Sequence, residues 1–447
     1  MENEPLKKSK EAILEYGVDR VNKRCMASVF RYISEWEHMT ERVGFWVDLD
    51  QAYVTYHKPY VESVWWALSK LFERGLLYKG HKSVWWWAQG GTALSAGEVG
   101  NAYKTVDDPS VFVRFPLRDE DASLVVWTTT PWTLPSNQFA AVHPEFDYAY
   151  AKDGDQTLIL AAERVQALCE KVGRPLSVEK IVKGRDLVGR PYRPPFDAFW
   201  RETSDRDSYW RVVAGDRSTS PQPQYFVTLD SGTGVVHIAP AFGEDDWKLW
   251  RRLAVQEGQQ LHMFCAVRPD GKFDHRLADL GLEGVWVKKA DKTLEKDLES
   301  RGLLVHSETY RHEYPFCWRS ENDPLIQYVR DAWFVRTTAE IDRILQNNEA
   351  VDWMPEHIKH GRMGDFLAGN VDWALSRERF WGTPLNIWTC DACEHRVAPA
   401  SCAEIERLNP DAFRAFREAQ AEDPELSEHL IVHKPWIDQV ELPCESC

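Results

Sequence analysis

The chain has 447 residues, enough for two or three domains, and 43% of them are hydrophobic, which is enough to build buried cores. Its net charge of -16 argues against a protein that grips any nucleic acid by charge alone, although a local basic patch could still hold RNA. Nine cysteines, no apolar leader and no apolar run of roughly 18 residues favour a cytoplasmic protein with no disulfide framework and no membrane span.

Helical spacing of apolar residues predicts helices over residues 18–42 and 59–74. From about residue 100 to 305 short apolar runs predict a β-rich domain. The expected strands are 110–115, 123–128, 148–151, 156–160, 225–229, 234–239 and 263–267, and the expected helices are 161–172, 244–257 and 291–302. After residue 310 the pattern predicts helices over 338–348, 401–408 and 410–420 and a strand over 384–388.

The most unusual segment of the chain is a run of three threonines, Thr128, Thr129 and Thr130, between an apolar stretch and Pro131. Val125 and Val126 favour a strand, and Pro131 removes a backbone donor and stops the ladder. The threonine hydroxyls then lie at a strand end, where they can face a ligand. The alternative is an ordinary β-branched strand that closes in a proline turn.

A second polar group follows another expected strand, Gly232–Pro240, which carries His237. Three carboxylates, the last of them Asp246, open the next helix, where acidic residues are ordinary caps. The functional interpretation is that Asp246 binds a ligand ammonium group and His237 orients the ligand or transfers a proton. A lone histidine in an apolar strand is also a common core residue, so a shared pocket is plausible but not required.

The clearest metal signal is a pair of Cys-x-x-Cys knuckles, Cys390 with Cys393 and Cys444 with Cys447. Four thiolates at this spacing predict a tetrahedral structural Zn²⁺ site with no open coordination position. Free thiols and two redox dithiols are the alternatives. Cys317 has only Ser320 at the second position of a knuckle, so we expect it to be a buried thiol and not a ligand.

Taken in order, these segments resemble isoleucyl-tRNA synthetases, which are class I aminoacyl-tRNA synthetases. The resemblance is carried by Gly44–Asp50, Gly91–Ser95, Trp127–Asn137, Gly232–Pro240, Trp318–Leu325, Asp372–Gly382 and the terminal cysteines. It implies an α/β fold in which a partial Rossmann-type catalytic domain is interrupted by a β-rich editing domain and bears a four-cysteine zinc element. The implied ranges are 1–104 for a catalytic portion with connective helices, 105–305 for editing, 306–389 for the return to the catalytic domain and 390–447 for the zinc knuckles.

The resemblance also implies roles for individual residues. Those matching the family's editing pocket are Thr128, Thr129, Thr130, Trp132, His237 and Asp246. Asp246 would hold the α-ammonium of valine misattached to tRNA-Ile, and Trp132 would wall the pocket against isoleucine. Trp373 matches a wall of the isoleucine pocket in the synthetic site. Isoleucyl-tRNA synthetase is itself the usual example of double-sieve editing, in which a second site hydrolyses the product made with the wrong amino acid. The second site is needed because binding alone rejects valine only about 150-fold.

The chain departs from the family pattern at three places. It has neither a His-Ile-Gly-His-type segment nor a Lys-Met-Ser-Lys-Ser-type loop, which in the parent enzyme grip ATP with Mg²⁺. Trp87–Gly90 stands where many relatives have a Cys-x-x-Cys, so we expect that first metal site to be absent. We therefore expect a monomer that retains at most editing. The alternative is a non-catalytic, zinc-stabilised tRNA-binding or scaffold fragment.

Overall fold

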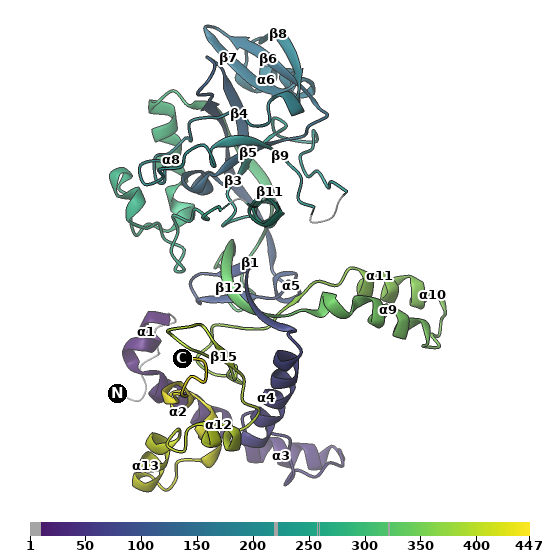
Figure 1. Cartoon of the computed structure of the whole chain (residues 1–447), viewed down its shortest axis with the longest axis vertical. Helices are drawn as coiled ribbons and strands as arrows, with labels where there is room; N and C mark the ends of the chain where they lie inside the picture. Colours follow the sequence, from purple (N-terminus) through teal and green to yellow (C-terminus); the bar gives the residue numbers. More distant parts are fainter. Residues whose placement is uncertain (1–9, 219–221, 257, 259, 321) are drawn as a thin grey trace. The chain divides into compact units, whose positions relative to one another are not determined.

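The computed structural model describes residues 10–218, 222–256, 258, 260–320 and 322–447. The chain divides into two compact units (Figure 1). The inserted unit is residues 81–330, and the discontinuous unit combines residues 1–80 with 331–447. The expected editing range of 105–305 falls inside the inserted unit, but its boundaries stay a prediction.

The inserted unit is built on a nine-stranded mixed sheet. Its strands follow the order β8-β6-β7-β4-β10-β5-β9, and β3 joins β4 to β11. β10 runs parallel to β4, β4 to β7 and β5 to β9, while the other pairs are antiparallel. The strands are β3 (Tyr103–Pro116), β4 (Ser123–Thr128), β5 (Phe139–Val142), β6 (Asp147–Asp153), β7 (Gln156–Ala161), β8 (Ser177–Lys183), β9 (Arg211–Ala214), β10 (Val235–Ile238) and β11 (Leu304–Pro315).

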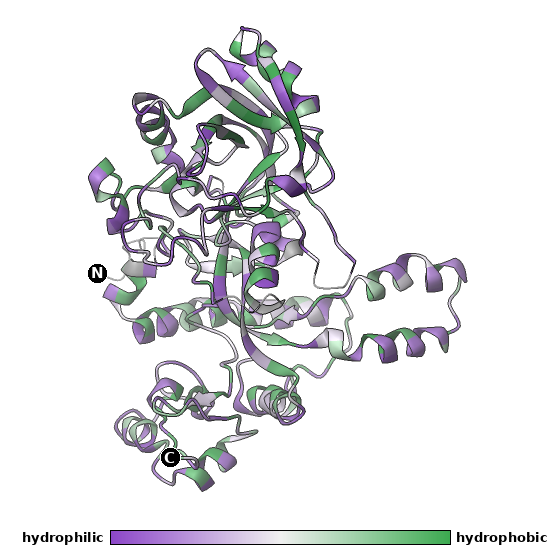
Figure 2. Ribbon diagram, turned by 45° about the horizontal axis from the view of Figure 1, so that its top comes forward, coloured by the Kyte–Doolittle hydropathy of each residue, from purple (hydrophilic) through white to green (hydrophobic). Residues whose placement is uncertain are grey.

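Both faces of the central strand β4 are buried, which explains its uninterrupted apolar sequence. Leu124 and Val126 point into the main core of the unit, whereas Val125 points into a second cluster under the helix α6 (Val165–Val172). Hydrophobic residues accordingly run along the central strands in Figure 2. The other helical segments are α5 (Ala96–Val99), α7 (Glu244–Arg251), α8 (Val287–Ser300), the π turn η4 (Arg252–Gln256) and the 3-10 turns η1 (Pro131–Ser136), η2 (Ala162–Arg164), η3 (Gly184–Asp186) and η5 (His275–Leu280).

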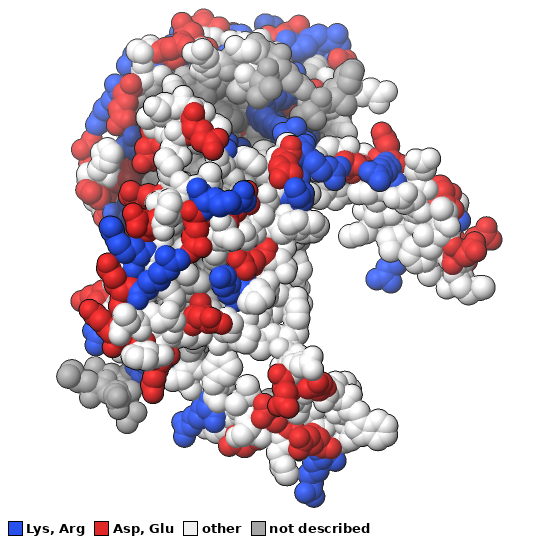
Figure 3. Space-filling model, turned by 60° about the horizontal axis from the view of Figure 1, so that its bottom comes forward, with Lys and Arg blue, Asp and Glu red and all other residues white. Residues whose placement is uncertain are grey.

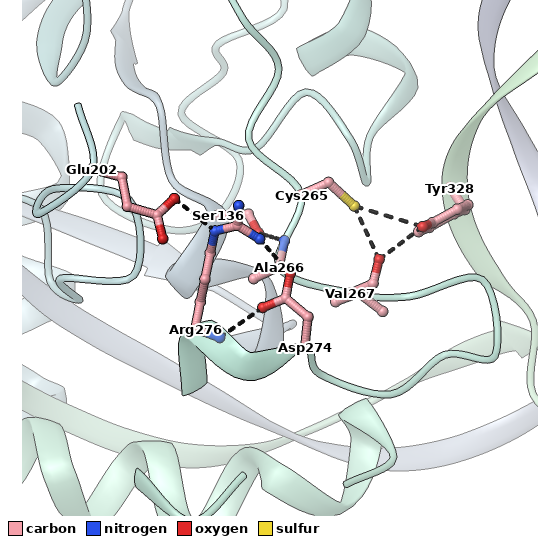
Figure 4. A network of polar contacts seen from close by, with 8 residues as sticks. All are labelled: Ser136, Glu202, Cys265, Ala266, Val267, Asp274, Arg276 and Tyr328. Atoms are coloured by element: carbon pink, nitrogen blue, oxygen red, sulfur yellow. Dashed lines mark hydrogen bonds and ion pairs between the residues drawn. The ribbon is translucent and has the colours of Figure 1, made fainter. Parts of the chain in front are cut away.

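Two strands expected in this unit, 225–229 and 263–267, are wrong. Val227, Phe264 and Val267 are buried, but Tyr225 is 37% exposed, and Tyr225 and Val267 make only isolated bridges. Around residue 265 the backbone donors are taken by side chains instead of a neighbouring strand: Phe264 N–H donates to Gln138, and Ala266 N–H donates to the Ser136 hydroxyl at 3.0 Å (Figure 4). Side-chain partners thus satisfy the backbone without a ladder.

The discontinuous unit is mainly helical. The helix expected over 18–42 is interrupted at residues 31–32, giving α2 (Val18–Phe30) and α3 (Ile33–Arg42). The remaining helices are α1 (Lys10–Tyr16), α4 (Lys58–Glu73), α9 (Ile341–Glu349), α10 (His357–His360), α11 (Arg362–Ala368), α12 (Cys402–Leu408) and α13 (Arg414–Glu422). α4 packs its buried Val61 and Trp65 against Ile405 and Phe413 of the C-terminal segment.

The strands of the discontinuous unit are few. β13 (Trp373–Ala374) pairs antiparallel with the end of β12 (Ile326–Val335), and β14 (Trp388–Thr389) pairs antiparallel with β15 (Arg396–Val397). Of the strand expected over 384–388, only Trp388 is in a strand, and that strand ends at Thr389. β1 (Leu77–Trp87) begins in this unit and continues into the inserted unit, where β2 (Thr92–Leu94) pairs antiparallel with it. A Rossmann sheet needs parallel strands joined by helical crossovers, so that part of the expected fold stays a prediction.

The surface mixes charges of both signs. On the face shown in Figure 3, acidic and basic side chains alternate over short distances. Among the described residues, charged side chains form ion pairs such as Arg190 with Asp119 and Arg174 with Asp153. None of the helices in the described ranges is both long enough and apolar enough to cross a bilayer.

Candidate functional site

A cavity of about 310 Å³ opens in the inserted unit where β4 and β10 end. β4 and β10 are parallel, with Trp127 opposite Val236, so the residues that follow both strands emerge at one edge of the sheet. This register brings the threonine run beside the strand that carries His237. The lining comprises Trp127, Thr128, Thr129, Thr130, Thr133, Phe226, Thr228, Ser231, Gly232, Thr233, Gly234, Val235, Val236, His237, Ala239, Phe242, Gly243 and Asp246.

The hydroxyls of Thr128, Thr130 and Thr133 form a connected set at the start of η1. The Thr128 hydroxyl accepts the N–H of Thr130 at 3.1 Å and lies 3.2 Å from the Thr130 hydroxyl. Thr133, one turn further on, donates its hydroxyl to the Thr130 carbonyl at 2.8 Å. Pro131 starts η1 and has no N–H, so the chain leaves the sheet here as the sequence predicts. The strand end is therefore part of a cavity wall.

His237 borders the cavity but is held on both sides by the protein. Its Nδ1 lies 2.8 Å from the Asn137 amide nitrogen, and its Nε2 lies 3.0 Å from the Thr133 hydroxyl. Burial lowers the pKa of His237 to about 3, so the ring is neutral at physiological pH. Of the two expected roles, orientation fits this environment, because a ring with so low a pKa is a weak base and both of its nitrogens are held by the protein.

Asp246 lies in the first turn of α7, and its carboxyl group faces the cavity. One of its oxygens accepts the N–H of Ala239 at 2.8 Å, directly after β10. Burial raises the pKa of Asp246 to about 7, although the Ala239 N–H opposes that shift. Gly243 leaves room for the carboxyl group, because a Cβ at this position would lie 2.8 Å from the Asp246 Cγ. A carboxyl group with this pKa is ready to ionise when a cation approaches.

Trp132 does not line the cavity, contrary to the expectation that it forms the wall. Its buried ring packs edge-on against Phe242, with 5.0 Å between ring centroids, and Phe242 is the residue that meets the cavity. Thr133, the next residue of η1, does line the cavity, so successive side chains of this turn point to different sides. Trp132 thus supports the wall from behind.

The sequence argument also missed Phe242 and Thr133, which line the cavity, and Asn137, which contacts His237 from the core. Thr133 and Asn137 carried a signal, because both stand in the same motif as the three threonines. Phe242 carried none, since an aromatic residue after a strand is ordinary core composition.

The four cysteines of the two knuckles converge in the discontinuous unit. Their sulfurs all lie within 4.8 Å of one another, with 3.6 Å between Cys390 and Cys447 and 3.6 Å between Cys393 and Cys444. Zn–S bonds of about 2.3 Å would place sulfurs roughly 3.8 Å apart in a tetrahedron. The hairpin of β14 and β15 presents the first knuckle. The donor set and its spacing fit zinc.

Apolar residues surround Cys317, the one cysteine of the incomplete Cys-x-x-Cys pattern. Cys317 is 1% exposed and packs with Leu94, Val99 and Leu325, with Trp87 against them. The Trp87 indole donates to Asp323 at 2.9 Å. Cys317 is thus a buried thiol, as the sequence predicts. Trp373 lies in the discontinuous unit and is 58% exposed, so its role in an isoleucine pocket stays a prediction.

Comparison with known proteins identifies the class. The family model described as "tRNA synthetases class I (I, L, M and V)" matches residues 1–440. The chain therefore belongs to the class I tRNA synthetases.

Within this class the chain is similar to isoleucine–tRNA ligases. It is 43% identical over 440 residues to the enzyme of Bacillus thuringiensis (strain Al Hakam), covering 98% of this chain and 39% of that one. It is 42% identical over 443 residues to the enzyme of Thermus thermophilus, covering 98% and 38%. The chain thus spans about two fifths of the length of these curated relatives.

Among solved structures, the editing domain of the P. falciparum cytosolic leucyl-tRNA synthetase matches 45% of this chain and 99% of its own, with a TM-score of 0.31 and 7% identity. This similarity is too low to bear on function.

Proposed function

We propose that the inserted unit hydrolyses the ester bond of a misacylated tRNA, removing valine from tRNA-Ile. One observation carries the proposal: a single cavity collects an ionisable carboxyl group, Asp246, three adjacent hydroxyls and a neutral histidine. An aminoacyl ester offers an ammonium group, a carbonyl and ribose hydroxyls, which are complementary to these groups.

In this mechanism Asp246 ionises and pairs with the α-ammonium of the amino acid. The hydroxyls of Thr128 and Thr130 hold the ester and the terminal ribose. Water attacks the ester carbonyl, its oxygen bonds to the carbonyl carbon, and the carbon–oxygen bond to the ribose breaks, so that the ribose oxygen leaves with a proton. No side chain that lines the cavity is a cysteine or a serine paired with a base, so direct attack by water is the simplest route.

The parent activity that we propose is isoleucine–tRNA ligation with ATP. ATP and Mg²⁺ would supply activation of the carboxylate in the complete enzyme, and Trp373 would contribute to the isoleucine pocket there. Zinc held by Cys390, Cys393, Cys444 and Cys447 would hold the C-terminal segment of the discontinuous unit together. We also propose that the protein is monomeric and cytoplasmic.

The test is to incubate the chain with Val-tRNA-Ile and follow loss of the ester. We expect hydrolysis above the spontaneous rate. D246A should lower kcat/KM at least about 30-fold, because it removes one partner of a desolvated charge pair. The matched control is E244A, whose carboxylate lies in the same turn of α7 and pairs with Lys248 at 2.8 Å outside the cavity lining. Binding of tRNA without hydrolysis would favour the non-catalytic alternative, and equal rates for D246A and the parent chain would remove Asp246 from the mechanism.

A further inference from the structure

A continuous chain of hydrogen bonds runs from the core of the inserted unit to the cavity. The Tyr192 hydroxyl donates to the Asn137 Oδ1 at 2.7 Å, and the Asn137 amide nitrogen lies 2.8 Å from the His237 Nδ1. The His237 Nε2 lies 3.0 Å from the Thr133 hydroxyl, which donates to the Thr130 carbonyl. Tyr192 is 0% exposed, Asn137 2%, Thr133 5% and His237 6%, so water does not substitute for these partners.

The direction of this chain is fixed by a backbone carbonyl. The Asn137 amide nitrogen also donates to the Phe139 carbonyl at 3.0 Å, and a carbonyl can only accept. The nitrogen of the amide therefore faces His237, and the His237 Nδ1 must accept. In a neutral ring the proton is then on Nε2, which donates to Thr133.

This arrangement has a consequence for the cavity. The Thr133 hydroxyl accepts the hydrogen bond of the His237 Nε2–H group, so its own O–H group donates to the Thr130 carbonyl. The position of Thr130, in the cavity wall, thus depends on the tautomer of His237. The amide oxygen of Asn137 is the only remaining polar atom of that side chain, and the Tyr192 hydroxyl donates to it.

Resting on the proposed function, we propose that Tyr192, which does not line the cavity, is a positioning residue for ester hydrolysis. Its hydroxyl holds the Asn137 amide in the orientation that keeps His237 in the Nε2–H form and Thr130 in place. Without that hydroxyl the Asn137 oxygen is buried with no donor, a state that costs enough to make the amide move. The Tyr192 ring itself packs on Phe115, with 5.2 Å between centroids, and phenylalanine would fill the same space.

The experiment compares Y192F with Y209F in the full chain. Tyr209 is also buried, and its hydroxyl accepts the His262 N–H at 2.8 Å, away from the cavity lining. Each variant thus loses one hydroxyl from a tyrosine whose ring packs in the same core. Two quantities are measured: hydrolysis of Val-tRNA-Ile, and the ring-nitrogen signals of His237 in ¹⁵N-histidine-labelled protein, which distinguish a protonated from an unprotonated nitrogen.

For Y192F we expect kcat to fall about tenfold or more with little change in KM, since a displaced cavity wall misplaces the ester. We also expect a second set of His237 signals with the proton on Nδ1. Y209F should show neither change. A Y192F variant that hydrolyses within about twofold of the parent chain, or that keeps the single Nε2–H form, overturns the proposal. If the parent chain hydrolyses nothing, the proposed function fails, and the His237 signals alone then decide whether Tyr192 sets the tautomer.

Discussion

Burial moves the two titratable groups of the cavity in opposite directions, and both shifts favour the neutral form. It raises the pKa of Asp246 to about 7 and lowers the pKa of His237 to about 3. Near neutral pH the histidine therefore carries no charge, while the carboxyl group is balanced between its two forms. A substrate ammonium would tip that balance toward the carboxylate.

This balance predicts the pH dependence of hydrolysis. Only ionised Asp246 can pair with an ammonium group, so kcat/KM, divided by the spontaneous rate at the same pH, should rise about tenfold per unit up to pH about 7. D246N should show no such rise. A pH profile with an inflection near the ordinary pKa of histidine would instead assign the titration to His237.

The same shift predicts a stability change. The folded state holds a proton on Asp246 up to pH about 7, whereas an unfolded aspartate releases it near pH 4, so unfolding becomes easier as the pH rises between these values. Above pH 7 D246N avoids this cost and should be more stable than the parent chain by up to about 4 kcal/mol. At pH 4 the two should unfold at similar denaturant concentrations. Equal stability of both proteins at pH 8 would contradict the burial of this group.

At the scale of elements, the cavity depends on close packing at the residue where the chain enters β10. Gly234 precedes β10 with a φ of 75°, and a Cβ there would lie 2.5 Å from the Cβ of Ala161. G234A should destabilise the chain by about 2–4 kcal/mol and abolish hydrolysis, because the backbone must move. Gly154 has a φ of 61° but open space around it, so G154A should cost only about 1–2 kcal/mol. Denaturant unfolding measures both, and equal losses would contradict the steric argument.

The elements best predicted from sequence were those with strong local patterns. The helix α4 and the strand β4 lie within a residue of their predicted bounds, because apolar periodicity and a proline stop are local signals. The strands missed include β5, β8, β9 and β11. β5 and β9 have only four residues each, and β8 and β11 carry charged residues among their apolar ones, so none of them shows a clear local pattern. The segment at 263–267 was overpredicted for the opposite reason: its backbone partners are the side chains of Ser136 and Gln138.

At the scale of the whole molecule, the metal site and the cavity belong to different units. We expect one zinc per chain by elemental analysis. Its removal by a chelator should lower the unfolding temperature of the discontinuous unit and leave Val-tRNA-Ile hydrolysis unchanged. C393S should abolish metal binding, and C317S, which changes a thiol in an apolar cluster, should retain it. A chain that binds no zinc would contradict the four-cysteine assignment.

The sequence by itself determined the class of protein, the strand end with its three threonines, and the four-cysteine cluster, because each is written in a short run of residues with its own spacing. Only the tertiary structure decided which residues share the cavity. It placed Phe242 in the wall and Trp132 behind it, brought Asp246 beside the threonines, and connected His237 to Tyr192 through Asn137. The contacts that bring His237, Phe242 and Asp246 to the threonine segment join parts of the chain that lie about a hundred residues or more apart in the sequence. Burial, which sets the charge of Asp246 and His237, exists only once the sheet has formed.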